Sequence, residues 1–215
     1  MAEKLKLIPL LLVMLLVSGC MKYAYSVKQV APELAATGSG SLAVASHDQR
    51  DYVVSGKYRP QNVGVIRGAF GNPIFMNTAS GQPLADEMGE ALVAAFKQKG
   101  FEASLVTAAA TESTGQIHKK LRDSGAYRLI YFQINQWRTD TWNNLRMEYD
   151  FLLTVMDERA NILGKKGVSG DDNLGFLFGF NPLGMTQKRV AKALTERLEE
   201  LCNDPEIVTA LTGKR

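Results

Sequence analysis

The apolar run at 129–134, LIYFQI, constrains the fold more than any other part of the chain. It is rich in aromatic and β-branched residues and nearly free of polar ones, which predicts a central strand covered on both faces. Residues 147–155 instead alternate apolar and polar side chains, the period-two pattern of a strand with one wet face. A turn at 157–161 and a returning strand at 162–169 would complete a hairpin.

Helical periodicity appears before and after these strands. Four segments are expected to be helical, and the amphipathic ones carry apolar side chains along one face: residues 83–99, 113–124, 186–203 and 206–211. Five shorter segments have strand character: residues 41–46, 52–54, 63–66, 73–76 and 101–107. The pattern predicts an α/β (α+β) domain, a mixed sheet with helices mainly on one face.

The first twenty residues have the organisation of a secretion signal. Lys4 and Lys6 precede an apolar run at 7–17, and the small residues Ser18 and Gly19 lead to Cys20. Eleven residues rise only about 16 Å as a helix, too short for a stable membrane anchor. The ending VSGC resembles the lipobox of bacterial lipoproteins, in which the cysteine thiol is acylated and the signal is cut before it. The alternative is a plain cleaved signal with an incidental cysteine.

Cleavage there divides the chain into a signal peptide at 1–19, a lipidated flexible tether at 20–40 and a globular domain at 41–215. The tether is suggested by the small-residue stretch APELAATGSG. Met21 follows the cysteine where an Asp commonly favours inner-membrane retention in Gram-negative lipoproteins, so we expect the periplasmic face of the outer membrane. Cys202 is expected to be a small buried residue on the last long helix.

Composition excludes several classes of function. The formal net charge of +3 is too small to indicate nucleic-acid binding. Two cysteines and two histidines are too few for a usual zinc site, and no phosphate-binding or nucleophile motif is present. We therefore expect no metal, no cofactor and no catalytic residues. His118, beside two lysines, is expected to be solvated.

One polar cluster stands out, at the end of the first strand of the domain. His47, Asp48 and Arg50 could bind an anion or a protein partner, or take part in acid–base chemistry. The alternative is structural: an Asp48–Arg50 pair that ties a strand end to a neighbouring loop.

The segment at 174–185, LGFLFGFNPLGM, is unusually apolar for a loop. Phe176, Phe178 and Phe180 lie between glycines, and such a loop must be buried, touch lipid or meet a partner. The sequence leaves these three possibilities open.

Four features together resemble the YajG-type family of uncharacterised bacterial lipoproteins. They are VSGC, the string Asp48-Gln49-Arg50, the helix end KQKGF at 97–101 and the amphipathic C-terminal helix. The resemblance implies a small α/β periplasmic domain on an outer-membrane anchor and supplies no catalytic residues.

We therefore expect a non-enzymatic interaction or envelope-assembly module. It would be held to the bilayer by acylated Cys20 and would contact an envelope protein. The alternative is a small-molecule-binding protein or weak hydrolase acting on envelope glycans or lipids.

Overall fold

Strand β6, Arg128–Thr141, organises the sheet. Along one edge it pairs in parallel with β2, Ser41–Asp48, and further along with β3, Asn62–Arg67. Its other edge pairs antiparallel with β7, Asn144–Met156. The predicted central strand is thus confirmed, and it is longer than its apolar run because its second half continues past the end of β2.

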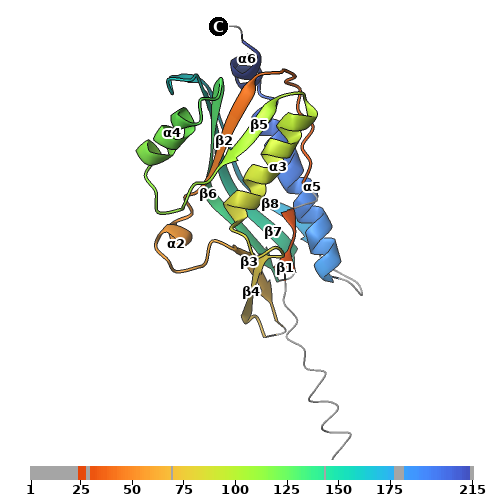
Figure 1. The fold of residues 1–215 in the computed structure, drawn as a ribbon. Helices are drawn as coiled ribbons and strands as arrows, with labels where there is room; N and C mark the ends of the chain where they lie inside the picture. Colours follow the sequence, from red (N-terminus) through yellow and green to blue (C-terminus); the bar gives the residue numbers. More distant parts are fainter. Residues whose placement is uncertain (1–23, 28–29, 69, 143, 177–181, 214–215) are drawn as a thin grey trace, which may run out of the picture.

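The computed structural model describes residues 24–27, 30–68, 70–142, 144–176 and 182–213 (Figure 1). In these ranges eight strands form one mixed sheet, in the order β1-β4-β3-β6-β2-β5, with β7 and β8 continuing from β6. The remaining strands are β1 Ala24–Tyr25, β4 Pro73–Thr78, β5 Glu102–Val106 and β8 Ile162–Phe176. The helices are α2 Asp51–Val54, α3 Leu84–Gln98, α4 Thr114–Asp123, α5 Pro182–Cys202 and α6 Pro205–Thr212.

The two faces of the sheet are covered unequally. Helices α3, α5 and α6 contribute to the larger buried cluster, which includes Ile130, Phe132 and Phe151. Helix α4 covers a smaller cluster on the other face, with Leu129 and Tyr131. This arrangement confirms the predicted α/β (α+β) class with helices mainly on one face. Cys202 is buried in α5, and burial raises the pKa of its thiol to about 12.

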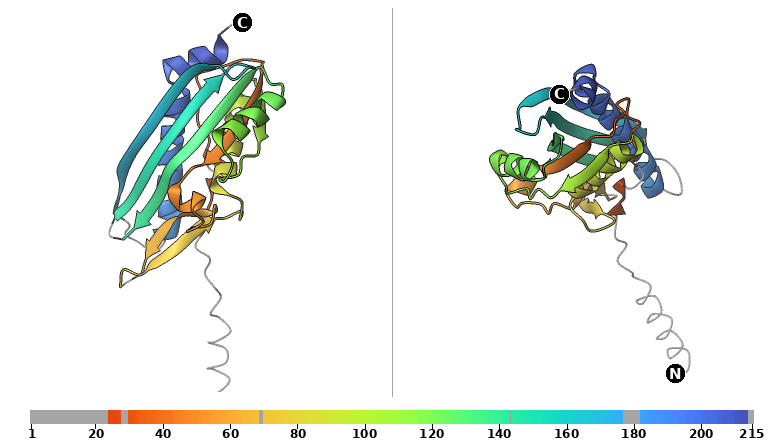
Figure 2. Two further views of the ribbon diagram at one scale, coloured as in Figure 1. Left: turned by 90° about the vertical axis from the view of Figure 1, so that its left-hand side faces the viewer. Right: turned by 45° about the horizontal axis from the view of Figure 1, so that its top comes forward.

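The hairpin of β7 and β8 lies beside β6, and Figure 2 shows the three long strands side by side with α5 behind them. On β7, Met147, Tyr149 and Phe151 are buried against the helices, whereas the intervening side chains are exposed or half-buried. This confirms the strand with one wet face. Strand β8 continues to Phe176, beyond the predicted end at residue 169.

Residues 52–54 were predicted as a strand and instead form part of α2. The amide groups of Val53 and Val54 both donate hydrogen bonds to the carbonyl of Arg50. The local β preference of Tyr-Val-Val is overridden because the chain must turn immediately after Arg50, whose side chain is fixed inside the fold.

The expectation of a flexible tether is wrong for residues 30–40, which pack against the domain. Val30, Leu34 and Ala36 are buried in the larger cluster. The side chain of Asn203, directly after the end of α5, donates a hydrogen bond to the carbonyl of Glu33 and accepts one from the amide of Ala35. Every second residue from 30 to 36 is buried, a period-two pattern obscured in the sequence by Pro32 at a buried position and by alanines at the exposed positions 31 and 35. The folded domain therefore begins before residue 41.

Candidate functional site

Asp48 and Arg50 lie where the edge of β6 changes partner. The last β2–β6 pair is Asp48 with Ile134, and the first β3–β6 pair is Gly64 with Thr139. Residues 135–138 of β6 therefore have neither β2 nor β3 beside them. The side chain of Arg50 occupies this junction and is completely buried.

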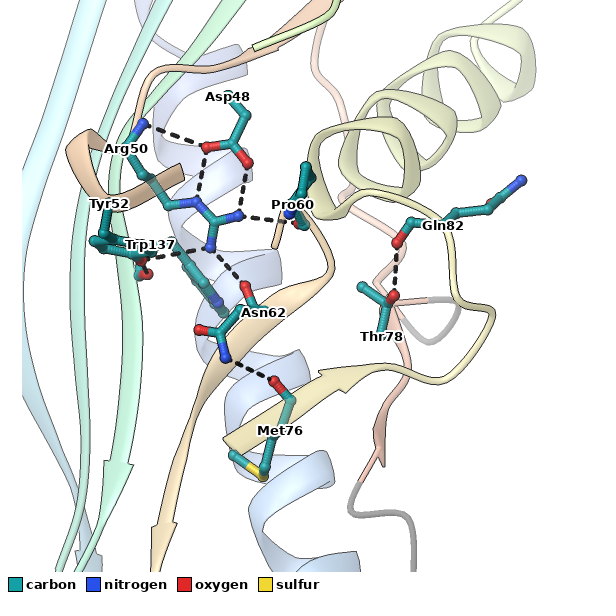
Figure 3. A network of polar contacts seen from close by, with 9 residues as sticks. All are labelled: Asp48, Arg50, Tyr52, Pro60, Asn62, Met76, Thr78, Gln82 and Trp137. Carbon is teal, nitrogen blue, oxygen red and sulfur yellow. Dashed lines mark hydrogen bonds and ion pairs between the residues drawn. The ribbon is translucent and has the colours of Figure 1, made fainter. Parts of the chain in front are cut away.

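Every N–H group of the Arg50 guanidinium has an acceptor inside the protein (Figure 3). Nε and one Nη donate to the two carboxylate oxygens of Asp48, at 2.7 and 2.6 Å. The remaining donors reach the carbonyls of Asn62 at 2.7 Å and Pro60 at 3.2 Å and the hydroxyl of Tyr52 at 3.4 Å. No donor is left for an external anion, because a guanidinium has five.

The network extends through neutral groups to the neighbouring strands. The hydroxyl of Tyr52 donates to the carbonyl of Trp137 on β6, and the amide side chain of Asn62 donates to the carbonyl of Met76 on β4. Burial disfavours the charge of Arg50, but the hydrogen bonds and charge of Asp48 outweigh it and raise the pKa of Arg50. Asp48 and Arg50 therefore form the structural pair given as the alternative to a binding site: they join the end of β2 to β3 and to the loop before β3.

His47 is separated from this network because successive side chains of a strand point to opposite faces. Its Nδ1 shares a hydrogen bond of 2.8 Å with the hydroxyl of Tyr131, and the two rings stack. His118 on α4 meets Tyr131 edge to face. His118 is therefore half-buried, contrary to the solvated position expected from its lysine neighbours. The structure does not bring His47 together with Asp48 and Arg50.

An open hollow of about 610 Å³ lies beside His47, at the carboxyl end of β2. Its lining includes Gln49, Asn135 and the loop at 110–113. Gln49 was predicted only as part of the string Asp48-Gln49-Arg50, and Asn135 was not predicted. Their signal is positional: Gln49 directly follows the end of β2, and Asn135 lies within β6 next to Ile134, the residue that pairs with Asp48.

Both histidines should make stability depend on pH. Burial lowers the pKa of His47, partly offset by nearby carbonyls and carboxylates, and burial followed by the charge of Arg122 lowers the pKa of His118. In the unfolded chain the histidine pKa is about 6.5, so the unfolded chain binds protons before the folded chain does as the pH falls. The contribution of the two histidines to stability is therefore complete above that pH and is lost below it. We expect the free energy of unfolding, measured by urea denaturation from about pH 8 to about pH 5, to decrease with acidity.

The double variant His47→Gln/His118→Gln should flatten this decrease, whereas the exposed control Lys119→Gln should retain it. An unchanged pH slope in the double variant would show that other groups carry the dependence.

Of the apolar residues predicted for docking, Phe176 ends β8 and is 56% exposed. Phe178 and Phe180 lie outside the described residues, as does Cys20. The described residues contain no cluster of potential metal ligands. None of the described helices has the length and apolar character needed to cross a membrane.

Comparisons with known proteins give similarities at low scores. No protein-family model matches the chain, and no curated protein matches it. Protein XCC0632 from Xanthomonas campestris, with the family model DUF330, is 12% identical, with a TM-score of 0.47 over 86% of this chain and 92% of that one. The PelC dodecamer from Paraburkholderia phytofirmans is 11% identical, with a TM-score of 0.39 over 81% and 94%.

Lipoprotein GNA1162 from Neisseria meningitidis is 13% identical, with a TM-score of 0.29 over 73% of this chain and 99% of that one. Because all three TM-scores are below 0.5, these similarities carry no argument about function. The resemblance to the YajG-type family stays a prediction.

Proposed function

We propose that this chain is a lipoprotein of the bacterial envelope, anchored through Cys20 at the periplasmic face of the outer membrane. Its domain binds another envelope protein and performs no catalysis. Two features support this assignment: the lipobox VSGC, and the use of Asp48 and Arg50 as a saturated structural pair.

The observation that carries the binding role is the one-sided pairing of β8. Among the described strands it pairs with β7 alone. The ends of β8 are capped by side chains: Glu206 accepts a hydrogen bond from the amide of Lys165, and Arg189 donates to the carbonyls of Leu174 and Phe176. Between these caps, five of the seven residues at 167–173 are exposed. An exposed strand edge can pair with an extended segment of another protein.

In-cell photocrosslinking tests this role. A photoreactive residue in place of Ser169, at the centre of the edge, should form adducts with another envelope protein. The matched control replaces Glu158, which is exposed in the β7–β8 turn, and should form none. Adducts only between copies of this chain, or none from position 169, would contradict the proposed role.

A further inference from the structure

Exposed aromatic side chains gather at one end of the sheet. Phe70, in the loop between β3 and β4, is 98% exposed, and Trp142, in the turn between β6 and β7, is 62% exposed. The register of the sheet brings these turns together, since Ile66 pairs with Thr141 and Asn144 with Phe176. We call Phe70, Trp142 and Phe176 the aromatic tip. Strands β3 and β4 mark this end in Figure 1, opposite the C-terminus.

The ring of Trp142 is held in place although it is exposed. The guanidinium of Arg67 lies 5.4 Å from the ring centre and pairs with Asp140 at 2.6 Å. On the loop side, a Cβ at Gly71 would come within 2.9 Å of the ring, and Gly71 has a φ of 77°. Only glycine lets this loop approach Trp142 without strain. The protein therefore fixes a large apolar ring where water would surround it.

The length of chain before β1 determines what can lie against this end. Strand β1 runs parallel to β4, with Ala24 level with Asn77. Asn77 is four residues beyond Pro73, where β4 leaves the tip, a distance of roughly 13 Å at the usual strand rise. Cys20 precedes Ala24 by four residues, which span at most about 14 Å. The chain from Ala24 to Cys20 is therefore about as long as the distance from Ala24 to the aromatic tip. If Cys20 carries the lipid, the bilayer surface must lie close to the aromatic tip.

From these observations we propose that the aromatic tip inserts into the headgroup region of the bilayer that holds the anchor. This inference rests on the proposed anchoring of Cys20. Tryptophan is favoured at this depth because its ring is apolar while its N–H can still bond to water or headgroups, and phenylalanine is one of the residues that enter the same region from the apolar face of interfacial helices. The tip would fix the orientation of the domain, leaving the β8 edge directed along the membrane surface toward a partner.

The test anchors the mature chain, residues 20–215, chemically, so that it does not depend on lipidation in the cell. The described core residues all lie between Val27 and Leu211, so this chain contains the fold. The Cys20 thiol is coupled to a maleimide lipid in phosphatidylethanolamine–phosphatidylglycerol vesicles. Cys202 is buried, with the pKa of its thiol raised to about 12, and should not react.

Trp142 fluorescence reports the depth of the tip, because Trp137 is fully buried. We expect a blue shift on anchoring and loss of most of the Trp142 emission when the vesicles contain brominated acyl chains. The Trp142→Phe variant gives the background. The matched control, Trp142→Phe/Lys119→Trp, moves the reporter to an exposed site on α4, roughly 30 Å away along β6, where no quenching is expected. Phe70→Ser should reduce the quenching of Trp142.

Emission of Trp142 that is quenched no more than that of the reporter at position 119 would overturn the proposal. A blue shift that appears without vesicles and grows with protein concentration would also overturn it, because the tip would then bind a second copy of the chain. Neither outcome concerns Cys20 in the cell, which is tested separately by the mass of the native protein.

Discussion

Replacing Arg50 with methionine is expected to lower the free energy of unfolding by about 3–5 kcal/mol, the usual cost of removing one partner of a buried ion pair. The substitution leaves the carboxylate of Asp48 inside the fold without its two strongest donors. It also leaves the carbonyls of Asn62 and Pro60 without the guanidinium that now binds them. Urea denaturation of the mature chain measures the loss.

Two controls separate this effect from the general cost of losing an arginine. Arg138 is part-exposed in an ion pair with Asp140 at 3.3 Å, and Arg138→Met should cost no more than about 1 kcal/mol. The double variant Asp48→Leu/Arg50→Met removes both buried charges and should recover part of the stability lost in Arg50→Met. If Arg50→Met costs as little as Arg138→Met, the pair does not hold the junction between β2 and β3.

The second large effect concerns localisation. Cys20→Ser should remove the protein from the outer-membrane fraction of cells, because a hydroxyl does not accept the diacylglyceryl group that a thiol receives. Several acyl chains on one residue give stable attachment, where one would be marginal. Cell fractionation followed by immunoblotting measures the change.

Met21→Asp is the matched control for this experiment. It retains the acylated thiol and should move the protein from the outer to the inner membrane. A Cys20→Ser protein that remains in the outer-membrane fraction would show that another feature attaches the domain.

Most of the helices and strands could be predicted from the periodicity of the sequence. The alternation at 147–155 and the stripe on residues 83–99 predicted β7 and α3 because each buries one face against a neighbouring layer. Residues 30–36 were missed because alanine and proline obscure the alternation. Residues 52–54 were assigned to the wrong element because their conformation depends on Arg50, not on local preference.

Less of the candidate site could be predicted from the sequence. Adjacent residues such as His47 and Asp48 look like one cluster in a sequence, but a strand directs them to opposite faces. Conversely, Phe70 and Trp142 are far apart in the chain, and only the register of β3 on β6 brings their turns together. A phenylalanine directly before Gly71 in one turn and a tryptophan in another were the available signals.

The anchor at Cys20 is the claim on which the orientation and the proposed role both depend. The most direct test is the intact mass of the protein purified from bacterial membranes. We predict a chain of residues 20–215 carrying a diacylglyceryl thioether, together with the usual acyl group on the new amino terminus. A chain that still begins at Met1, or one with an unmodified Cys20, would contradict the account.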